Sequence, residues 1–237
     1  HFTPQDSLGG HDRFENGTEV NRDGYLTDLL STRAAEFVGR CADAKQPFLL
    51  SLHYTAPHWP WETREDGELA KGFGKGNPIY HLDGGNIHAY RRMIHHMDEG
   101  IGRVLAALDD KNVARDTIVV FTSDNGGERF SDSWPLVGGK MDLMEGGIRV
   151  PYVVRWPART PADTTTDQLA ITMDWVPTFF EAAGTSAHPD YPSDGLSLLK
   201  QLADPRAVAD RPLFWRMKHK EQRAIVSGRW KYLKVDE

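Results

Sequence analysis

The sequence predicts an α/β fold, because short apolar runs typical of buried strands alternate with amphipathic helical segments. The run "PFLLSLHY" (47–54) follows one such segment, and the runs "DTIVVFTS" (116–123) and "PYVVRW" (151–156) follow another. Short continuous apolar runs are typical of strands that are covered on both faces. Their alternation with helices predicts an α/β sheet with right-handed crossovers and with helices on its faces.

Three segments carry apolar residues at helical spacing. Residues 87–110 have the strongest pattern, with apolar side chains three and four positions apart along one face. Residues 25–41 place Cys41, the single cysteine, on their apolar stripe, so we expect a packed hydrophobe there rather than a nucleophile. A third helix is expected at 172–184, where Gly184 is placed to stop it. Its expected buried face consists of Met173, Val176, Phe180 and Ala183.

The last part of the chain has a different character. From Leu213 onward, three short strand-like runs, "LFWRMK", "RAIVSG" and "WKYLK", predict an antiparallel element. Residues 185–210 contain several Pro, Asp and Ser residues and one expected short helix near 196–202, which is typical of a connection. We therefore expect two parts: residues 1–184 with the α/β sheet, and residues 185–237 with the connection and a small antiparallel subdomain.

The composition indicates a globular chain with a core, since 39% of the 237 residues are hydrophobic and 26% are charged. A net charge of −6 argues against a nucleic-acid partner, because the phosphate backbone requires a basic surface. No apolar stretch approaches the roughly 20 residues needed to cross a bilayer, so we expect no membrane partner. Small molecules or sugars are the expected partners.

One strand-like run ends in residues suited to binding a cation. "TIVVF" is followed by "SDNGG", so Asp124 and Asn125 lie where the strand should leave the core, and open α/β sheets bind ligands beyond the carboxyl ends of their strands. A carboxylate and an amide carbonyl are hard oxygen donors, which suit calcium or magnesium. Gly126 and Gly127 allow a sharp turn. The same residue types are common in ordinary turns, so this stretch alone does not decide between the two readings.

Two further residues are candidates for binding an anion. Lys140 follows a glycine pair in "GGKMDLMEGGIRVP", and its ammonium group is a compact charge suited to sulfate or phosphate. His58 lies near two prolines that restrict the backbone in "LHYTAPHWPW". Taken alone, such a lysine is usually solvated and such a histidine is usually structural. His95 and His96 are adjacent on the long helix and point in different directions, so we expect helix surface there rather than a metal site.

Together and in this order, these residues resemble the sulfatase family, of the arylsulfatase A and N-acetylgalactosamine-6-sulfatase type, within the alkaline-phosphatase-like superfamily. The resemblance runs through nearly the whole chain and is most specific in "VVFTSDNGG" followed by "GGKMDLMEGGIRVP". It implies that Asp124 and Asn125 are ligands of a divalent cation, usually Ca²⁺ or otherwise Mg²⁺. It also implies that His58 and Lys140 contact the sulfate group of a sulfated small molecule or glycan and help to stabilise or protonate the departing oxygen. The implied fold is part of an alkaline-phosphatase-like α/β sheet sandwiched by helices.

The resemblance also implies features that this chain does not contain. Sulfatases attack sulfur with a formylglycine made from the Cys or Ser of a C/S-x-P/A-x-R block, whereas Cys41 stands in "CADAK" and no such block occurs. The paired aspartates that complete the family's metal site have no counterpart before His58. We therefore expect a sulfatase chain without its N-terminal nucleophile-bearing part, inactive alone and able to self-associate through an exposed sheet edge. The alternatives are a catalytically silent anion- or sugar-binding module and a phosphoester hydrolase of the same superfamily.

Overall fold

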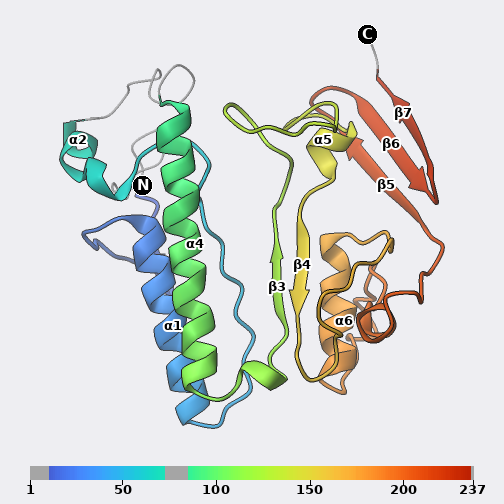
Figure 1. Ribbon diagram of the computed structural model, residues 1–237, viewed down its shortest axis with the longest axis horizontal. Helices are drawn as coiled ribbons and strands as arrows, with labels where there is room; N and C mark the ends of the chain where they lie inside the picture. The colour runs from blue at the N-terminus through green and yellow to red at the C-terminus, as the bar shows by residue number, and fades with distance from the viewer. Residues whose placement is uncertain (1–10, 73–84, 236–237) are drawn as a thin grey trace. The chain divides into compact units, whose positions relative to one another are not determined.

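The structure, a computed structural model, describes residues 11–72 and 85–235. The chain forms two compact units, residues 1–114 and residues 115–237, whose elements are drawn in Figure 1. The sequence predicts a boundary after residue 184 between two parts of the family's architecture. This is a different kind of division from the two compact units, and it stays a prediction. Among the described helices, none is both long enough and apolar enough to cross a membrane.

The first unit is built on two long helices, α1 (Leu26–Asp43) and α4 (Ile87–Asp110). Figure 1 shows them side by side and running in the same direction. Both helices form where the periodicity predicts them. The other elements of this unit are β1 (Phe14–Glu15), β2 (Thr18–Glu19), the 3-10 turn η1 (Arg64–Asp66) and α2 (Gly67–Gly72), and the 3-10 turn η2 (Ala114–Asp116) follows α4.

Local capping and packing explain both helices. Helix α4 begins after Asn86, whose side-chain oxygen accepts hydrogen bonds from the backbone N–H groups of His88 at 2.9 Å and Ala89 at 3.0 Å. These bonds satisfy donors that a helix start leaves unpaired. Cys41, near the end of α1, is half-buried rather than fully packed, and it lies outside the fully buried face of this helix. That face consists of Thr27, Ser31, Ala34 and Val38.

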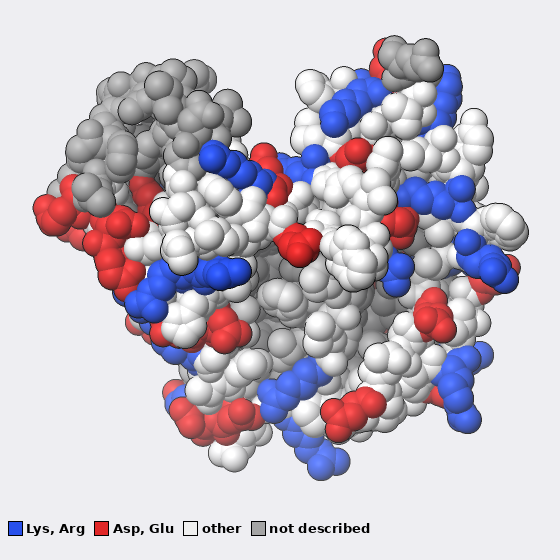
Figure 2. Space-filling view, turned by 45° about the horizontal axis from the view of Figure 1, so that its top comes forward, with Lys and Arg blue, Asp and Glu red and all other residues white. Residues whose placement is uncertain are grey.

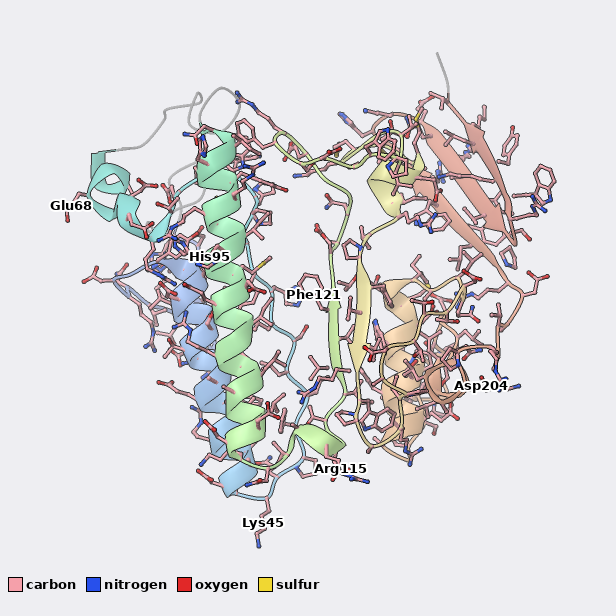
Figure 3. All side chains as sticks on the ribbon, in the orientation of Figure 1. Lys45, Glu68, His95, Arg115, Phe121 and Asp204 are labelled. Atoms are coloured by element: carbon pink, nitrogen blue, oxygen red, sulfur yellow. The ribbon has the colours of Figure 1, made fainter. Side chains whose placement is uncertain are left out.

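The prediction that His96 lies on a solvated helix surface is wrong. Its side chain is 0% exposed, whereas the side chain of His95 is 55% exposed and is seen at the surface of α4 in Figure 3. The imidazole of His96 lies edge-on to the ring of Tyr25, with 5.7 Å between centroids, and its Nδ1 accepts a long hydrogen bond from the backbone N–H of Arg64 at 3.5 Å. Helical spacing alone did not reveal this contact, because η1 comes from a separate part of the sequence.

Residues 47–54 do not form the predicted strand. This segment has no regular secondary structure. Its side chains alternate between half-buried and exposed, and Leu49 is 71% exposed. None of the strands formed by the described residues pairs with it. An apolar run favours an extended backbone by itself, but a strand also requires a hydrogen-bonding partner, which local sequence does not specify.

The second unit contains the predicted strands β3 (Val119–Thr122) and β4 (Tyr152–Arg155). They pair antiparallel, with Val120 opposite Val154, so this pair is not linked by the expected right-handed parallel crossover. The segment between them reverses the chain and brings β4 back beside β3. The short helical elements of this unit are α5 (Glu145–Ile148), η3 (Thr172–Asp174), α6 (Trp175–Ala182) and α7 (Leu199–Ala203).

The predicted buried face of α6 is wrong, since Met173 is 43% exposed and Val176 is 50% exposed. The helix instead turns Trp175 and Thr178 inward, next to the fully buried Asp174. A buried carboxylate must be paired, and this one accepts hydrogen bonds from residues 22 and 37 positions further along the chain. These distant partners, rather than hydrophobic periodicity, set the orientation of the helix.

The predicted antiparallel element is confirmed. Strands β5 (Pro212–Met217), β6 (Gln222–Ser227) and β7 (Trp230–Lys234) form a three-stranded antiparallel sheet in that order. Side chains alternate strictly between its two faces, and Leu213 and Ala224 on the inner face are buried. The inner face therefore packs into the second unit, and the outer face is open.

Candidate active site

Asp124 and Asn125 lie directly beyond the end of β3, where the sequence predicts them. The side-chain Nδ2 of Asn125 donates a hydrogen bond to Asp124 Oδ2 at 2.5 Å, so the two side chains share one location. The hydroxyl of Ser123 donates to the backbone carbonyl of Asn125 at 3.0 Å and closes the turn. Asp124 is exposed and Asn125 is half-buried, so a carboxylate and an amide meet at an accessible strand end.

The glycines after Asn125 allow two loops to pack backbone against backbone. The N–H of Gly126 donates to the carbonyl of Gly147 at 2.8 Å, and a Cβ on Gly126 would lie 1.8 Å from the carbonyl oxygen of Gly146. A Cβ on Gly147 would similarly lie 2.0 Å from the carbonyl oxygen of Asp142. No side chain fits at these positions without movement of the main chain, so the glycines of "DNGG" and "EGGIRVP" are required by close packing.

Lys140 is bonded to the same turn. Its backbone N–H donates to the carbonyl oxygen of Gly127 at 2.8 Å. Its Nζ lies 3.3 Å from Glu128 Oε2, and its side chain is 22% exposed. The ammonium group is therefore partly shielded from water and lies next to the carboxylate of Glu128. Glu128 is not one of the predicted site residues, although it directly follows "DNGG".

The C-terminal sheet holds the far end of the Lys140 loop. The side-chain Oε1 of Gln222, on β6, accepts a hydrogen bond from the backbone N–H of Leu143 at 2.9 Å, and both residues are buried. Lys231, on β7, donates to Glu145 Oε1 at 2.7 Å. These positioning residues lie more than 75 positions from the loop, and no local motif could have identified them.

His58 lies on an exposed turn of the first unit. Its Nδ1 donates to the carbonyl oxygen of Trp59 at 2.7 Å, so this ring nitrogen carries a proton. Both ends of the His58 segment are attached to residues in and just before α1: Tyr54 Oη lies 2.8 Å from Ser31 Oγ, and Tyr25 Oη donates to the carbonyl oxygen of Glu62 at 3.0 Å. The histidine is therefore carried by a segment with two fixed ends.

An ion-pair network fixes the chain just after this segment. Arg64 forms a bidentate pair with Asp28 of α1, with distances of 2.6 and 2.9 Å, and also reaches Glu99 of α4 at 2.8 Å. Arg103 donates to Asp28 at 2.6 Å. Burial acts to raise the pKa of Asp28, but the hydrogen bonds from the two arginines outweigh it and hold this pKa below its ordinary value. The planar, bidentate geometry orients η1 against both long helices.

The four predicted site residues are thus divided between the two units. Asp124, Asn125 and Lys140 lie on neighbouring loops of the second unit, joined through Gly127. His58 belongs to the first unit, and its convergence with the other three residues stays a prediction. Among residues 11–72 and 85–235, no group of three or more His, Cys, Asp and Glu side chains is arranged to hold a metal ion.

A family model described as Sulfatase matches residues 1–185. The chain belongs to the sulfatase family. The Escherichia coli (strain K12) protein named uncharacterized sulfatase YdeN is 32% identical over 197 residues, which cover 81% of this chain and 34% of that protein. Human N-acetylgalactosamine-6-sulfatase is 36% identical over 198 residues, which cover 80% of this chain and 34% of that enzyme. The chain therefore spans about a third of the length of these relatives.

Solved sulfatase-family structures have the same fold. The crystal structure of Ps i-CgsB matches with a TM-score of 0.77 and 32% identity, covering 93% of this chain and 48% of that one. The structure of BT4656 in complex with its substrate D-glucosamine-2-N,6-O-disulfate matches with a TM-score of 0.70 and 20% identity, covering 93% of this chain and 62% of that one. At this identity the match shows a shared fold only. The predicted fold class, an alkaline-phosphatase-like α/β fold with a small antiparallel sheet at the C-terminus, is confirmed.

Proposed function

We propose that this chain is part of an enzyme that hydrolyses sulfate esters of carbohydrates. The observation that carries the proposal is the loop pair in which the Lys140 backbone bonds Gly127 beside the Asp124 and Asn125 strand end, in a chain of the sulfatase family. A sulfate ester is anionic, and further charge develops on its leaving oxygen as the ester bond breaks. Positively charged groups held in fixed positions stabilise such a transition state.

In this proposal, Lys140 binds a sulfate oxygen and His58 donates a proton to the departing oxygen. Glu128 is at present the neighbour of the Lys140 ammonium group, at 3.3 Å, and an incoming sulfate would compete with this carboxylate as the charge-assisted partner. Because the Nδ1 proton of His58 is bonded to Trp59, the transferred proton would come from Nε2 of the doubly protonated imidazolium, and the ring would be left neutral with its proton on Nδ1.

Asp124 and Asn125 would hold a divalent cation, Ca²⁺ or Mg²⁺. Their carboxylate and amide oxygens have the donor chemistry that such ions prefer. When bound, the cation supplies positive charge that offsets charge on the sulfuryl oxygens. Two donors are fewer than the roughly six that Ca²⁺ requires, and the described residues form no larger cluster. We therefore expect this chain alone to bind the cation weakly.

The names of the relatives favour a sulfated glycan as the substrate. One relative is named N-acetylgalactosamine-6-sulfatase, and Ps i-CgsB has been solved in complex with k-i-k-neocarrahexaose, with 31% identity to this chain and a TM-score of 0.76. A smaller sulfated molecule is the second candidate, because mouse steryl-sulfatase is 36% identical over 190 residues, covering 76% of this chain and 28% of that enzyme.

The test is turnover of an activated aryl sulfate by the complete protein with added Ca²⁺. Lys140→Gln should lower kcat/KM by about 10²- to 10³-fold, the range for removal of one transition-state donor. The matched control is Lys218→Gln, an exposed lysine in the turn between β5 and β6. The proposal fails if both variants behave alike, or if Lys140→Gln leaves turnover unchanged.

Two further measurements address the alternatives. A higher turnover of the corresponding aryl phosphate than of the aryl sulfate would indicate a phosphoester hydrolase. Residues 1–237 alone should give no turnover above background, because the sequence contains no formylglycine block. Absence of turnover in the complete protein as well, together with retained sulfate binding, would indicate a catalytically silent binding module.

A further inference from the structure

The carboxylate of Glu128 is held beside Lys140 by the turn that follows β3. The backbone N–H of Ser131 donates to the carbonyl oxygen of Glu128 at 3.0 Å, and the Ser131 hydroxyl donates to the same oxygen. The turn is tight, because a Cβ on Gly127 would lie 2.1 Å from Ser131 Oγ. The backbone N–H of Lys140 donates to the carbonyl oxygen of Gly127 at 2.8 Å. Both members of the ion pair are therefore attached to one turn.

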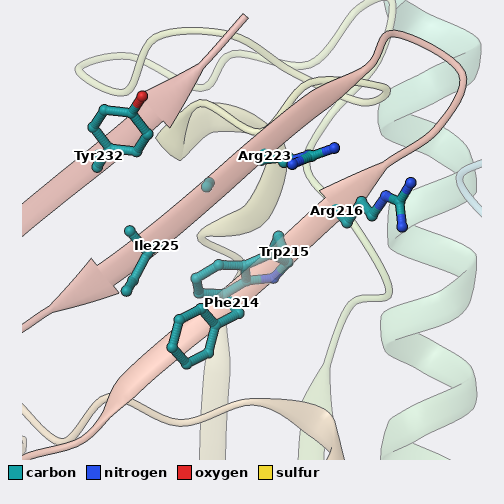
Figure 4. Close-up of a pocket in the computed structure, with 7 residues that line it drawn as sticks. Phe214, Trp215, Arg216, Arg223, Ile225 and Tyr232 are labelled. Atoms are coloured by element: carbon teal, nitrogen blue, oxygen red, sulfur yellow. The ribbon is translucent and has the colours of Figure 1, made fainter.

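The loop that carries Lys140 is also held at its far end by the C-terminal sheet. Strand β6, which carries Arg223 and Ile225 in Figure 4, also carries Gln222. The side-chain Oε1 of Gln222 accepts a hydrogen bond from the backbone N–H of Leu143 at 2.9 Å. Because the loop is fixed on both sides of Lys140, its main chain cannot carry the ammonium group away from the carboxylate.

This ion pair brings a negative charge close to the proposed position of the bound anion. Glu128 Oε2 lies 3.3 Å from Lys140 Nζ, and a charge-assisted bond from the ammonium to an anion is about 2.8 Å long. The carboxylate oxygen and the nearest oxygen of the anion are then at most about 6 Å apart. The side chains of Lys140 and Glu128 are 22% and 41% exposed, so water screens this repulsion only in part.

Sulfate and phosphate esters share a tetrahedral shape and differ in charge. A sulfate monoester carries one negative charge, whereas a phosphate monoester carries nearly two above its second pKa of about 6. Repulsion by a fixed carboxylate grows in proportion to the charge of the ligand. At about 6 Å, one extra unit charge weakens binding by about three-fold in water, and by more where the site excludes water.

We propose that Glu128 makes the Lys140 site selective for singly charged sulfate esters over doubly charged phosphate esters. The proposal rests on the proposed function, because it concerns the anion that Lys140 binds. A lysine alone attracts a dianion more strongly than a monoanion, and so does a divalent cation. Glu128 offsets this preference by direct contact with the lysine and leaves the ammonium group in place.

The overall charge of the molecule does not provide this selectivity. Acidic and basic side chains are interspersed over the face shown in Figure 2, although the chain has a net charge of −6. Exposed charges further away than about 8 Å are largely screened at physiological salt. Discrimination between two anions of the same shape therefore depends on charges in the immediate neighbourhood of the ligand, and Glu128 is such a charge.

The test uses the complete protein and two non-hydrolysable ligands with the same aromatic ring. The aryl sulfonate carries one charge at pH 8.5, and the aryl phosphonate carries two. Glu128→Gln preserves the shape of the side chain and removes its charge. By calorimetry, this variant should improve binding of the phosphonate about three- to ten-fold more than binding of the sulfonate. The ratio of kcat/KM for an aryl phosphate to that for an aryl sulfate should rise by the same factor, and high salt should reduce the difference.

Two control variants separate the charge of Glu128 from other effects. Glu181→Gln removes the same charge at an exposed position of α6 and should leave both ratios unchanged. Glu128→Asp retains the charge and should keep the selectivity of the wild type. The proposal is overturned if Glu128→Gln changes the affinity for both ligands equally, which would show that Glu128 only positions Lys140. It is also overturned if Glu181→Gln changes the ratios as much, or if Glu128→Asp behaves like Glu128→Gln.

The binding measurement also separates this proposal from the proposed function. A wild-type protein that binds the sulfonate but does not hydrolyse an aryl sulfate would contradict the proposed function, whereas the ratio of the two affinities would still decide the role of Glu128. Absence of binding of both ligands would overturn both proposals.

Discussion

Gly126 and Gly146 approach so closely that a Cβ on Gly126 would lie 1.8 Å from the carbonyl oxygen of Gly146. The obstacle is main chain, which cannot move aside as a side chain can. This contact joins the strand end that carries Asp124 to the start of α5, and the Lys140 backbone bonds the same turn. The position of Lys140, the proposed sulfate-binding residue, therefore depends on a residue that has no side chain.

The first prediction follows from this contact. Gly126→Ala should separate the two loops, destabilise the protein by about 1–3 kcal/mol through overpacking, and reduce aryl sulfate turnover by the complete protein to the level of Lys140→Gln. Urea denaturation and kinetics measure the two effects. A Gly126→Ala protein with unchanged stability and full activity would show that the loops tolerate separation.

The glycines of the helix pair give a second prediction, in which two substitutions have opposite signs. A Cβ on Gly100 would lie 2.2 Å from Ser31 Oγ, whereas a Cβ on Gly102 would meet no heavy atom within 4 Å. Gly102→Ala should stabilise α4 by about 0.5–1 kcal/mol, because alanine is the better helix former. Gly100→Ala should instead destabilise the protein by about 1–3 kcal/mol, because Ser31 Oγ must give up its hydrogen bonds to Thr27 and Tyr54 or α1 must shift. Equal effects in chemical denaturation would contradict this account of the helix contact.

Sequence periodicity was sufficient for elements that are determined locally. It predicted α1, α4 and the three C-terminal strands, since each has apolar residues at its own period or a clear turn signal. It gave the wrong buried face for α6, because the partners of Asp174 lie 22 and 37 positions away. It also predicted a strand at 47–54. The apolar run is present there, but none of the described strands pairs with this segment.

The candidate site was predictable in part for the same reason. Asp124, Asn125 and Lys140 belong to short sequence motifs, and the paired glycines beside them indicate close backbone packing. Gln222 and Lys231, which hold the end of the Lys140 loop, belong to a sheet more than 75 positions away. Their roles depend on tertiary contact, and a single sequence carries no local signal for such contact.

The third prediction concerns pH. Burial lowers the pKa of His96 below its ordinary value of 6.5, and Arg64 lowers it further, although Glu65 acts in the opposite direction. The unfolded chain therefore binds a proton at His96 more readily than the folded chain, so this residue should reduce stability as pH falls through about 6.5. Each unit by which the fold lowers the pKa of His96 corresponds to about 1.4 kcal/mol of unfolding free energy. His96→Gln should thus lose less stability than the wild type between pH 7.5 and pH 5.5.

The measurement for His96 is urea denaturation at the two pH values. The change in the free energy of unfolding between these pH values is compared between proteins, rather than the free energy itself. His95→Gln is the matched control, because its side chain is 55% exposed and lies one position away on the same helix. The carboxylates with lowered pKa, such as Glu65 at about 2, lose their contribution at lower pH than this window. Identical changes for the wild type and His96→Gln would show that the buried imidazole does not control stability here.

The last prediction is that residues 1–237, isolated in solution, self-associate and bind a hydrophobic dye. Among the described strands β3 pairs only with β4, and Phe121, which is labelled in Figure 3, lies directly opposite Val153. The two side chains are 41% and 58% exposed. An unpaired strand edge beside exposed apolar side chains promotes edge-to-edge association. Phe121→Thr/Val153→Thr should reduce light scattering and dye binding, whereas Phe14→Thr, at an aromatic residue 56% exposed on the β1–β2 hairpin, should change neither. A compact, cooperatively melting monomer without dye binding would contradict the prediction and would identify the chain as a self-sufficient domain.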